Sequence, residues 1–480
     1  MIDTLEPAPL WRFFSKLCKI PRPSKHEQQV SLFIQHTANK LNLEVHVDSI
    51  GNVLVKKEAT AEKKNSPTVI LQSHLDMVEQ KNSGINHDFN RDPIQTYIDG
   101  DWVKAKDTTL GADNGIGVAA TLSVLQSTDL VHGPIEALFT VDEESGMSGA
   151  FHLAPELLKG KLLISLDSEN DDELFIGCAG GVNATAQLSS ICEITDNHRT
   201  SFQICLKGLR GGHSGIDIHL GRANAIKQLN RVLFELVQNF DIRISSFSGG
   251  SARNAIPREA FASFVIADSY LEELKAFIAG LQNKLFQEYF ATDPEITLEL
   301  TQIPQIKEVL TCPAQQNLLR AVYACPNGIV RMNSQFPELV ETSNNLAMLE
   351  CSEGKNTFHC LLRSSLESAR DDLANAVLSA LSLAGAHVEF SGAYPGWQPD
   401  PDSQLLKKLQ STYEDIFKKK PGIRVIHAGL ECGIIGAKYP GLDMVSIGPT
   451  ICHPHSPNEA VSISSVQKFW RFLTASLRQL

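Results

Sequence analysis

The chain has 480 residues, of which 42% are hydrophobic and 20% are charged, and its formal net charge is −12. This length is too great for one ordinary hydrophobic core, so at least two domains are expected. The acidic balance argues against nucleic acid as a partner, because a phosphate backbone attracts positive charge. No apolar run approaches the roughly 18–20 residues that cross a membrane. The first residues, MIDTLEPAPLWRFFSKL, lack the apolar segment of a secretion signal.

Ten cysteines are scattered along the chain, and none forms a Cys-x-x-Cys pair. In a long chain without a secretion signal, this usage is typical of reduced, mostly buried thiols and not of a disulfide framework. We therefore expect a cytoplasmic protein.

The first 60 residues predict two amphipathic helices and a hairpin. The segment APLWRFFSKLCKI (8–20) has helical spacing and stops at Pro-Arg-Pro. A second helix follows PSKHEQQV (23–30) and runs to about residue 43. The segment LEVHVDSIGNVLVKK (43–57) then alternates through a turn at Gly51-Asn52.

Three apolar runs come next, and each ends in polar or acidic residues. They are PTVILQSHLDMV (67–78), GPIEALFTVDEE (133–144) and GKLLISLDSEN (160–170). Between the first two, LGADNGIGVAATLSVLQS (110–127) has a glycine-rich start and then helical spacing. Alternating strands and helices predict an α/β fold with a mostly parallel sheet that is covered on both faces. Ligands bind beyond the carboxyl ends of such strands, so the acids there are the first functional signal.

From about Thr185 the pattern changes. The segment 184–209 alternates like antiparallel strands, and RANAIKQLNRVLFELVQ (222–238) has the spacing of an amphipathic helix, which predicts an α+β domain. After the Pro/Gly-rich SGAYPGWQPDPDS (391–403), we expect the tail to return to buried parallel strands. The predicted organisation is an α/β domain in two parts, residues 1–185 and 389–480, with the α+β domain 186–388 inserted between them.

Three adjacent acids, Asp142 to Glu144, end the second apolar run, although like charges repel where little water is available. A solvated turn is one interpretation, and a neighbouring cation is the other. Further donors near strand ends favour the cation: His74 and Asp76 of SHLDMV, Asp113 of LGADNG, Asp167 of SLDSE, and His453 and His455 of CHPHSPNE. Imidazole with carboxylate suits Zn²⁺ and related ions. Two such ions about 3.5–4 Å apart lower the pKa of a bound water from about 15.7 towards about 7, and a nearby carboxylate then takes its proton.

Several motifs together resemble the M20 metallopeptidases, and among them the aminoacyl-histidine (Xaa-His) dipeptidases. They occur in the same order from about residue 5 to the C-terminus: SHLDMV, TTLGADNGIG, TVDEESGMSGA, SLDSE, GCAGG, RGGHSG, RNAIP, HAGLECG and SIGPT…PHSPNE. The resemblance implies a catalytic domain of the zinc-peptidase type with an inserted lid and dimerisation domain. It also implies a homodimer that hydrolyses dipeptides, including Xaa-His dipeptides such as carnosine.

The resemblance further implies roles for individual residues. Two divalent metal ions, Zn²⁺ or else Mn²⁺ or Co²⁺, would be held by His74, Asp113, Glu144, Asp167 and His455. Asp113 would bridge the two ions, Glu143 would be the general base, and Asp76 would hold the His74 ring. The residues expected to contact the substrate are His213, Asn254, Arg363 and Gly429. Arg363 would bind the terminal carboxylate. In related members, the histidine and asparagine that match His213 and Asn254 often come from the partner subunit.

Alternatives stay open at this point. The same scaffold would suit a broad-specificity dipeptidase, a tripeptidase or a deacylase of N-acyl amino acids, and a non-catalytic peptide-binding protein is a more remote alternative. Taken alone, Asp113 could be a turn residue and Asp167 a helix cap. His453 and His455 would share one face of an extended segment, so spacing does not choose between them, although the resemblance favours His455. The run GIGVAA imitates a dinucleotide fingerprint but lacks a strand directly before it.

Overall fold

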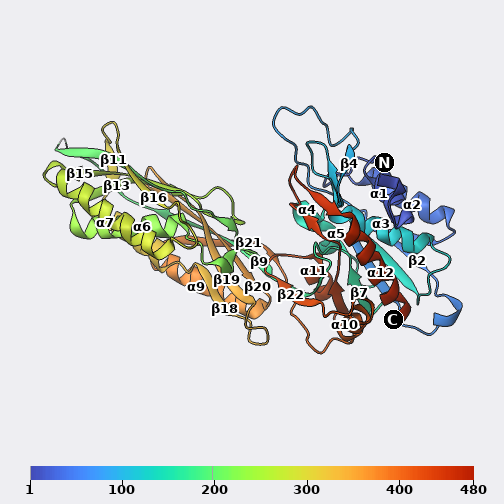
Figure 1. Cartoon of the computed structure of the whole chain (residues 1–480). Helices are drawn as coiled ribbons and strands as arrows, with labels where there is room; N and C mark the ends of the chain where they lie inside the picture. The colour runs from blue at the N-terminus through green and yellow to red at the C-terminus, as the bar shows by residue number, and fades with distance from the viewer. Residues whose placement is uncertain (1, 197) are drawn as a thin grey trace. The chain divides into compact units, whose positions relative to one another are not determined.

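The structure, a computed structural model, describes residues 2–196 and 198–480. It divides into two compact units. Unit 1 comprises the chain up to Cys178 together with Trp397–Val425 and Leu430–Leu480, and unit 2 comprises Ala179–Gly396 and Ile426–Gly429. In Figure 1 the blue and dark red ends of the chain therefore belong to one unit, and the green to orange middle belongs to the other. In the described residues, no helix combines the length and the apolar character that a membrane span requires.

Unit 1 is built on an eight-stranded sheet with the order β1-β2-β6-β3-β7-β23-β8-β22. The strands are β1 (Glu44–Val47), β2 (Val53–Lys57), β3 (Val69–His74), β6 (Ile135–Thr140), β7 (Leu162–Ser165), β8 (Glu173–Cys178), β22 (Gly422–Ile426) and β23 (Asp443–Ser446). The four central strands β6, β3, β7 and β23 run parallel. Strand β1 pairs antiparallel with β2, β2 with β6, and β8 with β23. The predicted parallel sheet is thus confirmed for the centre of the sheet, and its edges differ.

Helices and short helical turns surround this sheet, and the longer helices bury apolar residues against the core. They are α1 (Ala8–Leu17), α2 (Gln28–Lys40), α3 (Ala112–Gln126), α4 (Glu143–Gly146), α5 (Ser148–His152), α10 (Gln404–Phe417), α11 (Glu431–Lys438) and α12 (Ile463–Gln479), with 3-10 turns η1 (Ile2–Thr4) and η2 (Ala61–Lys63). Helix α1, for example, buries Leu10, Trp11, Phe14 and Leu17 along one stripe. Every residue of β3 and β6 is buried, as expected for strands covered on both faces.

The C-terminal tail differs in part from the prediction of buried parallel strands. Only β23 joins the parallel centre, where it pairs with β7. A second, four-stranded sheet has the order β24-β25-β5-β4, formed by β4 (Thr96–Asp99), β5 (Trp102–Ala105), β24 (Ile451–Cys452) and β25 (Ala460–Ser462). Strands β24 and β25 are antiparallel because the chain reverses between them, and this reversal carries His453 and His455.

Unit 2 is an α+β unit, as predicted. Its nine-stranded antiparallel sheet has the order β16-β11-β15-β13-β19-β20-β9-β21, with β18 paired to β19. The strands are β9 (Gly180–Ser189), β11 (Arg199–Lys207), β13 (Ile242–Gly249), β15 (Ala260–Ala267), β16 (Thr297–Gln302), β18 (Gly328–Met332), β19 (Val340–Ser352), β20 (Lys355–Ser364) and β21 (His387–Tyr394). Two small ribbons add β10 (Cys192–Ile194) with β17 (Glu308–Leu310), and β12 (Gly212–His213) with β14 (Ala255–Ile256).

The helices of unit 2 pack against its sheet. They are α6 (Ala225–Asn239), α7 (Leu271–Tyr289), α8 (Cys312–Ala324) and α9 (Glu367–Ser382), with 3-10 turns η3 (Ile218–Leu220) and η4 (Asp268–Tyr270). Figure 1 shows α6 and α7 lying along the strands β11, β13, β15 and β16. Helix α6 begins where the Asn224 side chain accepts a hydrogen bond from the Lys227 amide, and its buried stripe includes Leu229, Leu233 and Leu236.

The parallel centre of unit 1 explains where the polar residues gather. Strands β6, β3 and β7 are neighbours and run in the same direction, so their carboxyl ends meet at one edge of the sheet. Strand β3 ends at His74, β6 ends two residues before Asp142, and β7 ends two residues before Asp167. The sheet topology therefore brings these residues to the edge at which α/β proteins bind ligands.

Candidate metal centre

The carboxylate of Asp113 lies between two imidazoles. Its Oδ1 is 3.1 Å from His74 Nε2, and its Oδ2 is 3.1 Å from His455 Nε2. Asp167 Oδ1 lies 3.2 Å from His74 Nε2, and Glu144 Oε2 lies 3.0 Å from His455 Nε2. The five predicted ligands thus form two sets that share Asp113, and within each set the donor atoms lie within 4.8 Å of one another.

Each of these side chains comes from a different chain segment. His74 is the last residue of β3, Asp113 lies in the first turn of α3, and Glu144 lies in α4. Helix α3 begins after Gly111, whose φ of 68° is left-handed. A Cβ at Gly111 would lie 2.5 Å from the Arg22 guanidinium, so the start of α3 requires glycine for both its φ and its space.

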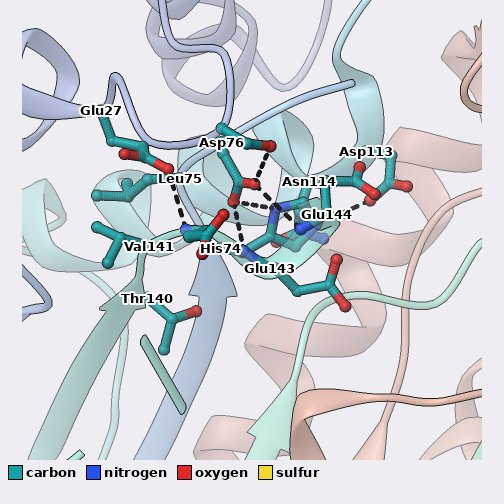
Figure 2. A network of polar contacts seen from close by, with 12 residues as sticks. Glu27, His74, Leu75, Asp76, Asp113, Asn114, Thr140, Val141, Glu143 and Glu144 are labelled. Carbon is teal, nitrogen blue, oxygen red and sulfur yellow. Dashed lines mark hydrogen bonds and ion pairs between the residues drawn. The ribbon is translucent and has the colours of Figure 1, made fainter. Parts of the chain in front are cut away.

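Asp76 connects the histidine to the acids that follow β6 (Figure 2). Its Oδ1 lies 3.3 Å from His74 Nδ1 and accepts a hydrogen bond from the Glu143 amide at 3.0 Å. Its Oδ2 accepts from the Glu144 amide at 3.1 Å and from the Ser24 hydroxyl at 2.8 Å. Although burial acts in the opposite direction, His74 and these donors hold the pKa of Asp76 below its usual range. Asp76 therefore orients both the imidazole and the turn that carries Glu143 and Glu144.

The three adjacent acids have three different environments. Asp142 precedes α4, and its carboxylate accepts hydrogen bonds from the hydroxyls of Ser145 and Ser148. The Glu144 carboxylate faces His455. A Glu143 oxygen lies within 4.8 Å of donor atoms of His74 and Glu144, and Figure 2 shows the Glu143 side chain directed away from Asp76. Burial raises the pKa of Glu143 well above its usual range.

The buried carboxylates of this centre outnumber the buried positively charged side chains near them. Among the described residues of unit 1, Arg22 is the one buried lysine or arginine side chain, and Glu144 Oε1 is buried without a hydrogen-bond partner. Burial and the Asp113 carboxylate raise the pKa of Glu144 to about 7. Against the effect of burial, Asp113 and Glu144 raise the pKa of His455 to about 11. Divalent cations would displace these retained protons, and imidazole with carboxylate is a suitable ligand set, so the residues fit a pair of such ions.

His453 takes no part in this arrangement. It is exposed and belongs to none of the three ligand groups in the described chain, whereas His455 faces Asp113 and Glu144. Both residues have a positive φ, 52° and 58°, so the segment is a turn and not the extended strand that would place both rings on one face.

The residues expected to contact the substrate all lie in unit 2. His213 and Asn254 are brought together by the ribbon β12–β14, in which His213 pairs with Ala255 and the Ser214 amide donates to the Asn254 carbonyl at 2.8 Å. The His213 Nδ1 accepts hydrogen bonds from the amides of Gly215 and Ile216. Burial and the Arg363 guanidinium lower the pKa of His213 to about 4. The ring is therefore neutral near pH 7, and its Nε2 carries the proton and acts as a donor.

Arg363 and Gly429 belong to the same unit. Arg363 lies on β20, where its guanidinium donates to the Tyr394 hydroxyl at 2.9 Å, and its Nε is buried without a hydrogen-bond partner among the described residues. Gly429 lies two residues after His427, a buried imidazole whose Nε2 lies 2.7 Å from the Ser343 hydroxyl. The Asn254 side chain is exposed.

Three buried side chains that hold the centre together, Arg22, Glu27 and Glu459, have no role assigned by the sequence motifs. Glu459 and Arg22 bind the backbone around the start of α3, and Glu27 accepts a hydrogen bond from the Asp142 amide. Glu431, which lies in the HAGLECG motif named above, is buried and accepts hydrogen bonds from Gln72 and Thr140. Glu459 was part of a quoted motif, yet an acid that binds backbone amides has no local signal because its partners lie far along the chain.

Comparisons with known proteins agree with this architecture. Residues 204–303 match the family model described as "Peptidase dimerisation domain" of the M20 peptidases, and residues 52–201 match "Peptidase family M28". The "Cytosol non-specific dipeptidase" of Escherichia coli is 44% identical over 479 residues, which cover 100% of this chain and 99% of the relative.

Two solved structures extend the comparison. The aminoacylhistidine dipeptidase of Vibrio alginolyticus is 46% identical, with a TM-score of 0.92 over 99% of this chain and 97% of that one. The aminopeptidase PepT of Bacillus cereus is 17% identical, with a TM-score of 0.59 over 99% of both chains, and so shares the fold.

These similarities define the class as peptidases with an α/β catalytic domain and a dimerisation domain. The chain belongs to the M20 family of peptidases. The resemblance predicted from the motifs and the expected fold class are confirmed.

Proposed function

We propose that the chain is a metal-dependent dipeptidase that hydrolyses Xaa-His and other dipeptides in the cytoplasm, as a homodimer. The observation that carries the proposal is the Asp113 carboxylate, whose two oxygens face the imidazoles of two separate donor sets. The full-length relatives support it, since they are named as a cytosolic non-specific dipeptidase and an aminoacylhistidine dipeptidase. The matched dimerisation domain supports the homodimer.

In this proposal His74, Asp113 and Asp167 hold one divalent ion, and Asp113, Glu144 and His455 hold the other. Imidazole and carboxylate donors favour Zn²⁺, with Mn²⁺ and Co²⁺ as alternatives. When bound, such a pair lowers the pKa of water and polarises the scissile carbonyl. Glu143 takes a proton from the attacking water and later delivers it to the leaving amine. Asp76 keeps the His74 ring and the Glu143 backbone in place for this transfer.

The residues of unit 2 bind the substrate in this proposal. Arg363 pairs with the terminal carboxylate, a task that suits the planar fork of a guanidinium. His213 donates from its Nε2 to the carbonyl oxygen, where negative charge develops in the transition state. Asn254 and Gly429 complete the contacts, with His213 and Asn254 supplied by the partner subunit.

The first test is removal and return of metal. Treatment with a chelator should abolish dipeptide hydrolysis, and adding back Zn²⁺, Mn²⁺ or Co²⁺ singly should restore it to different extents. The metal content, measured by mass spectrometry, should rise to two ions per chain as activity returns. Hydrolysis that survives complete metal removal would contradict the proposal.

A substrate panel distinguishes the alternatives on the same scaffold. Carnosine, Gly-His, a dipeptide without histidine, a tripeptide and an N-acyl amino acid should be compared by kcat/KM. We expect both Gly-His and the dipeptide without histidine to be hydrolysed, and the tripeptide and the N-acyl amino acid to be poor substrates. Preferred turnover of the N-acyl amino acid would indicate a deacylase instead.

Arg363→Lys should raise KM and lower kcat/KM by about 10- to 100-fold, because a charge-assisted hydrogen bond is worth about 1.5–3 kcal/mol and lysine lacks the fork. The matched control is a dipeptide amide, which has no terminal carboxylate. The variant should hydrolyse the amide at nearly the wild-type rate. An equal loss on both substrates would show that Arg363 does not bind the carboxylate.

A further inference from the structure

Glu459 has an unusual set of partners. Its Oε2 accepts hydrogen bonds from the amides of Leu110 and Gly111 at 2.7 and 2.9 Å. Its Oε1 accepts from the amides of Ala112 and Asp113 at 2.7 and 3.3 Å. The side chain is 2% exposed, and so one buried carboxylate binds four consecutive amides at the start of α3.

Arg22 binds the same segment through a carbonyl. Its Nη2 donates to the Gly111 carbonyl at 2.5 Å, and its Nη1 donates to the carbonyls of Leu75 and Asp76, both at 2.9 Å. The Gly111 residue is thus held at its N–H by Glu459 and at its C=O by Arg22. Because Leu75 follows His74, the guanidinium also ties the end of β3 to the start of α3.

These contacts join the segments that carry three predicted ligands. Glu459 lies four residues after His455 and binds the Asp113 amide, and Arg22 connects that loop to the residue next to His74. Neither Glu459 nor Arg22 belongs to a ligand group in the described chain. The hydrogen bonds of both side chains described here go to backbone atoms.

We propose that Glu459, together with Arg22, is a positioning residue that holds the Asp113 loop so that its carboxylate can bridge two metal ions. The inference rests on the proposed function. It requires a carboxylate at position 459, because four donors converge on two oxygens and glutamine would offer only one acceptor oxygen. In Glu459→Gln the amide NH₂ would face backbone N–H donors, and two of the four amides would lose their acceptor.

The chain offers a matched control. Glu136, at the start of β6, is also a buried carboxylate that accepts hydrogen bonds from backbone amides, those of Lys159 and Gly160, at 2.9–3.1 Å. It lies at the opposite end of the strand from the acids 142–144. Glu136→Gln therefore removes the same kind of interaction away from the ligands.

The experiment is a Zn²⁺ titration of chelator-stripped protein against a chromophoric competitor, with thermal unfolding of the metal-free protein measured in parallel. We expect Glu459→Gln to bind at least one of the two ions about 10- to 100-fold more weakly than wild type, the range seen when residues that orient ligands are changed. Glu136→Gln should keep both affinities within about twofold. Glu459→Asp, which keeps the charge but is one methylene shorter, should lie between them.

Wild-type affinity for both ions in Glu459→Gln would overturn the inference, even if its melting temperature falls as far as that of Glu136→Gln. Should Glu459→Gln not fold, Glu459→Asp and Arg22→Lys carry the same test, and unchanged affinity in both would overturn it. A wild-type protein that binds fewer than two ions would overturn the proposed two-metal function and this inference with it. If wild type binds two ions and only the variants at Glu459 and Arg22 bind metal more weakly, both the two-metal function and the positioning role are supported. The failure of one can therefore be told from the failure of the other.

Discussion

Glu143→Gln should lower kcat by about 10²- to 10⁴-fold, the usual contribution of a general base, and should leave two metal ions bound. The reason is its place beside the ligand sets. The Glu143 carboxylate lies near His74 and Glu144, but it belongs to neither of the two sets that share Asp113. Its backbone is fixed by Asp76, so the substitution removes proton transfer without moving the turn. Kinetics with Gly-His and metal analysis of the same sample measure both effects.

The neighbouring acids provide the controls for this prediction. Glu144→Gln should lose activity together with metal, because the Glu144 carboxylate faces His455. Asp142→Asn should lower the melting temperature and keep both metal and most activity, because its carboxylate binds the hydroxyls of Ser145 and Ser148. A near-wild-type rate in Glu143→Gln would show that another group manages the proton.

The sequence predicts which residues the structure brings together at this edge of the sheet. For His74, the acids 142–144 and Asp167, the reason is a short-range pattern. Strands β3, β6 and β7 are mostly apolar runs, and the polar residues that follow or end them stand out in such a context. Parallel strands with a common direction then bring those ends to one edge, which needs no knowledge of side-chain packing. The motif resemblance adds Asp113 and His455, whose segments lie outside these three strands.

The residues that hold the centre are less predictable because they depend on contacts between distant parts of the chain. Glu459 and the Leu110 amide are separated by 349 positions, and Arg22 and the Gly111 carbonyl by 89. The PHSPNE motif includes Glu459, but nothing in it indicates that this acid binds backbone amides far away in the chain. The strand directions in the C-terminal tail are also hard to predict, because its short apolar runs suit parallel and antiparallel strands equally. The turn at 453–459 makes β24 and β25 antiparallel.

Asp113→Asn should have the largest effect on metal binding. An asparagine has one carbonyl oxygen and an NH₂ group, so it can supply an oxygen ligand to only one of the two donor sets. We expect the metal content to fall from two ions to one or fewer, and kcat/KM to fall by at least about 10³-fold, because a metal ion contributes several kcal/mol to catalysis. Mass spectrometry of the dialysed protein and kinetics with Gly-His measure the two quantities.

The control for Asp113→Asn is Asp101→Asn, which changes another acid that connects distant segments. Asp101 accepts hydrogen bonds from Ser462 and Ser464 at the start of α12 and belongs to none of the ligand groups in the described residues. It should lose stability only. If Asp113→Asn kept two ions at wild-type affinity, the shared carboxylate would not be a bridge. The two donor sets would then be separate metal sites. The paired metal centre, from which hydrolysis was inferred, would not exist.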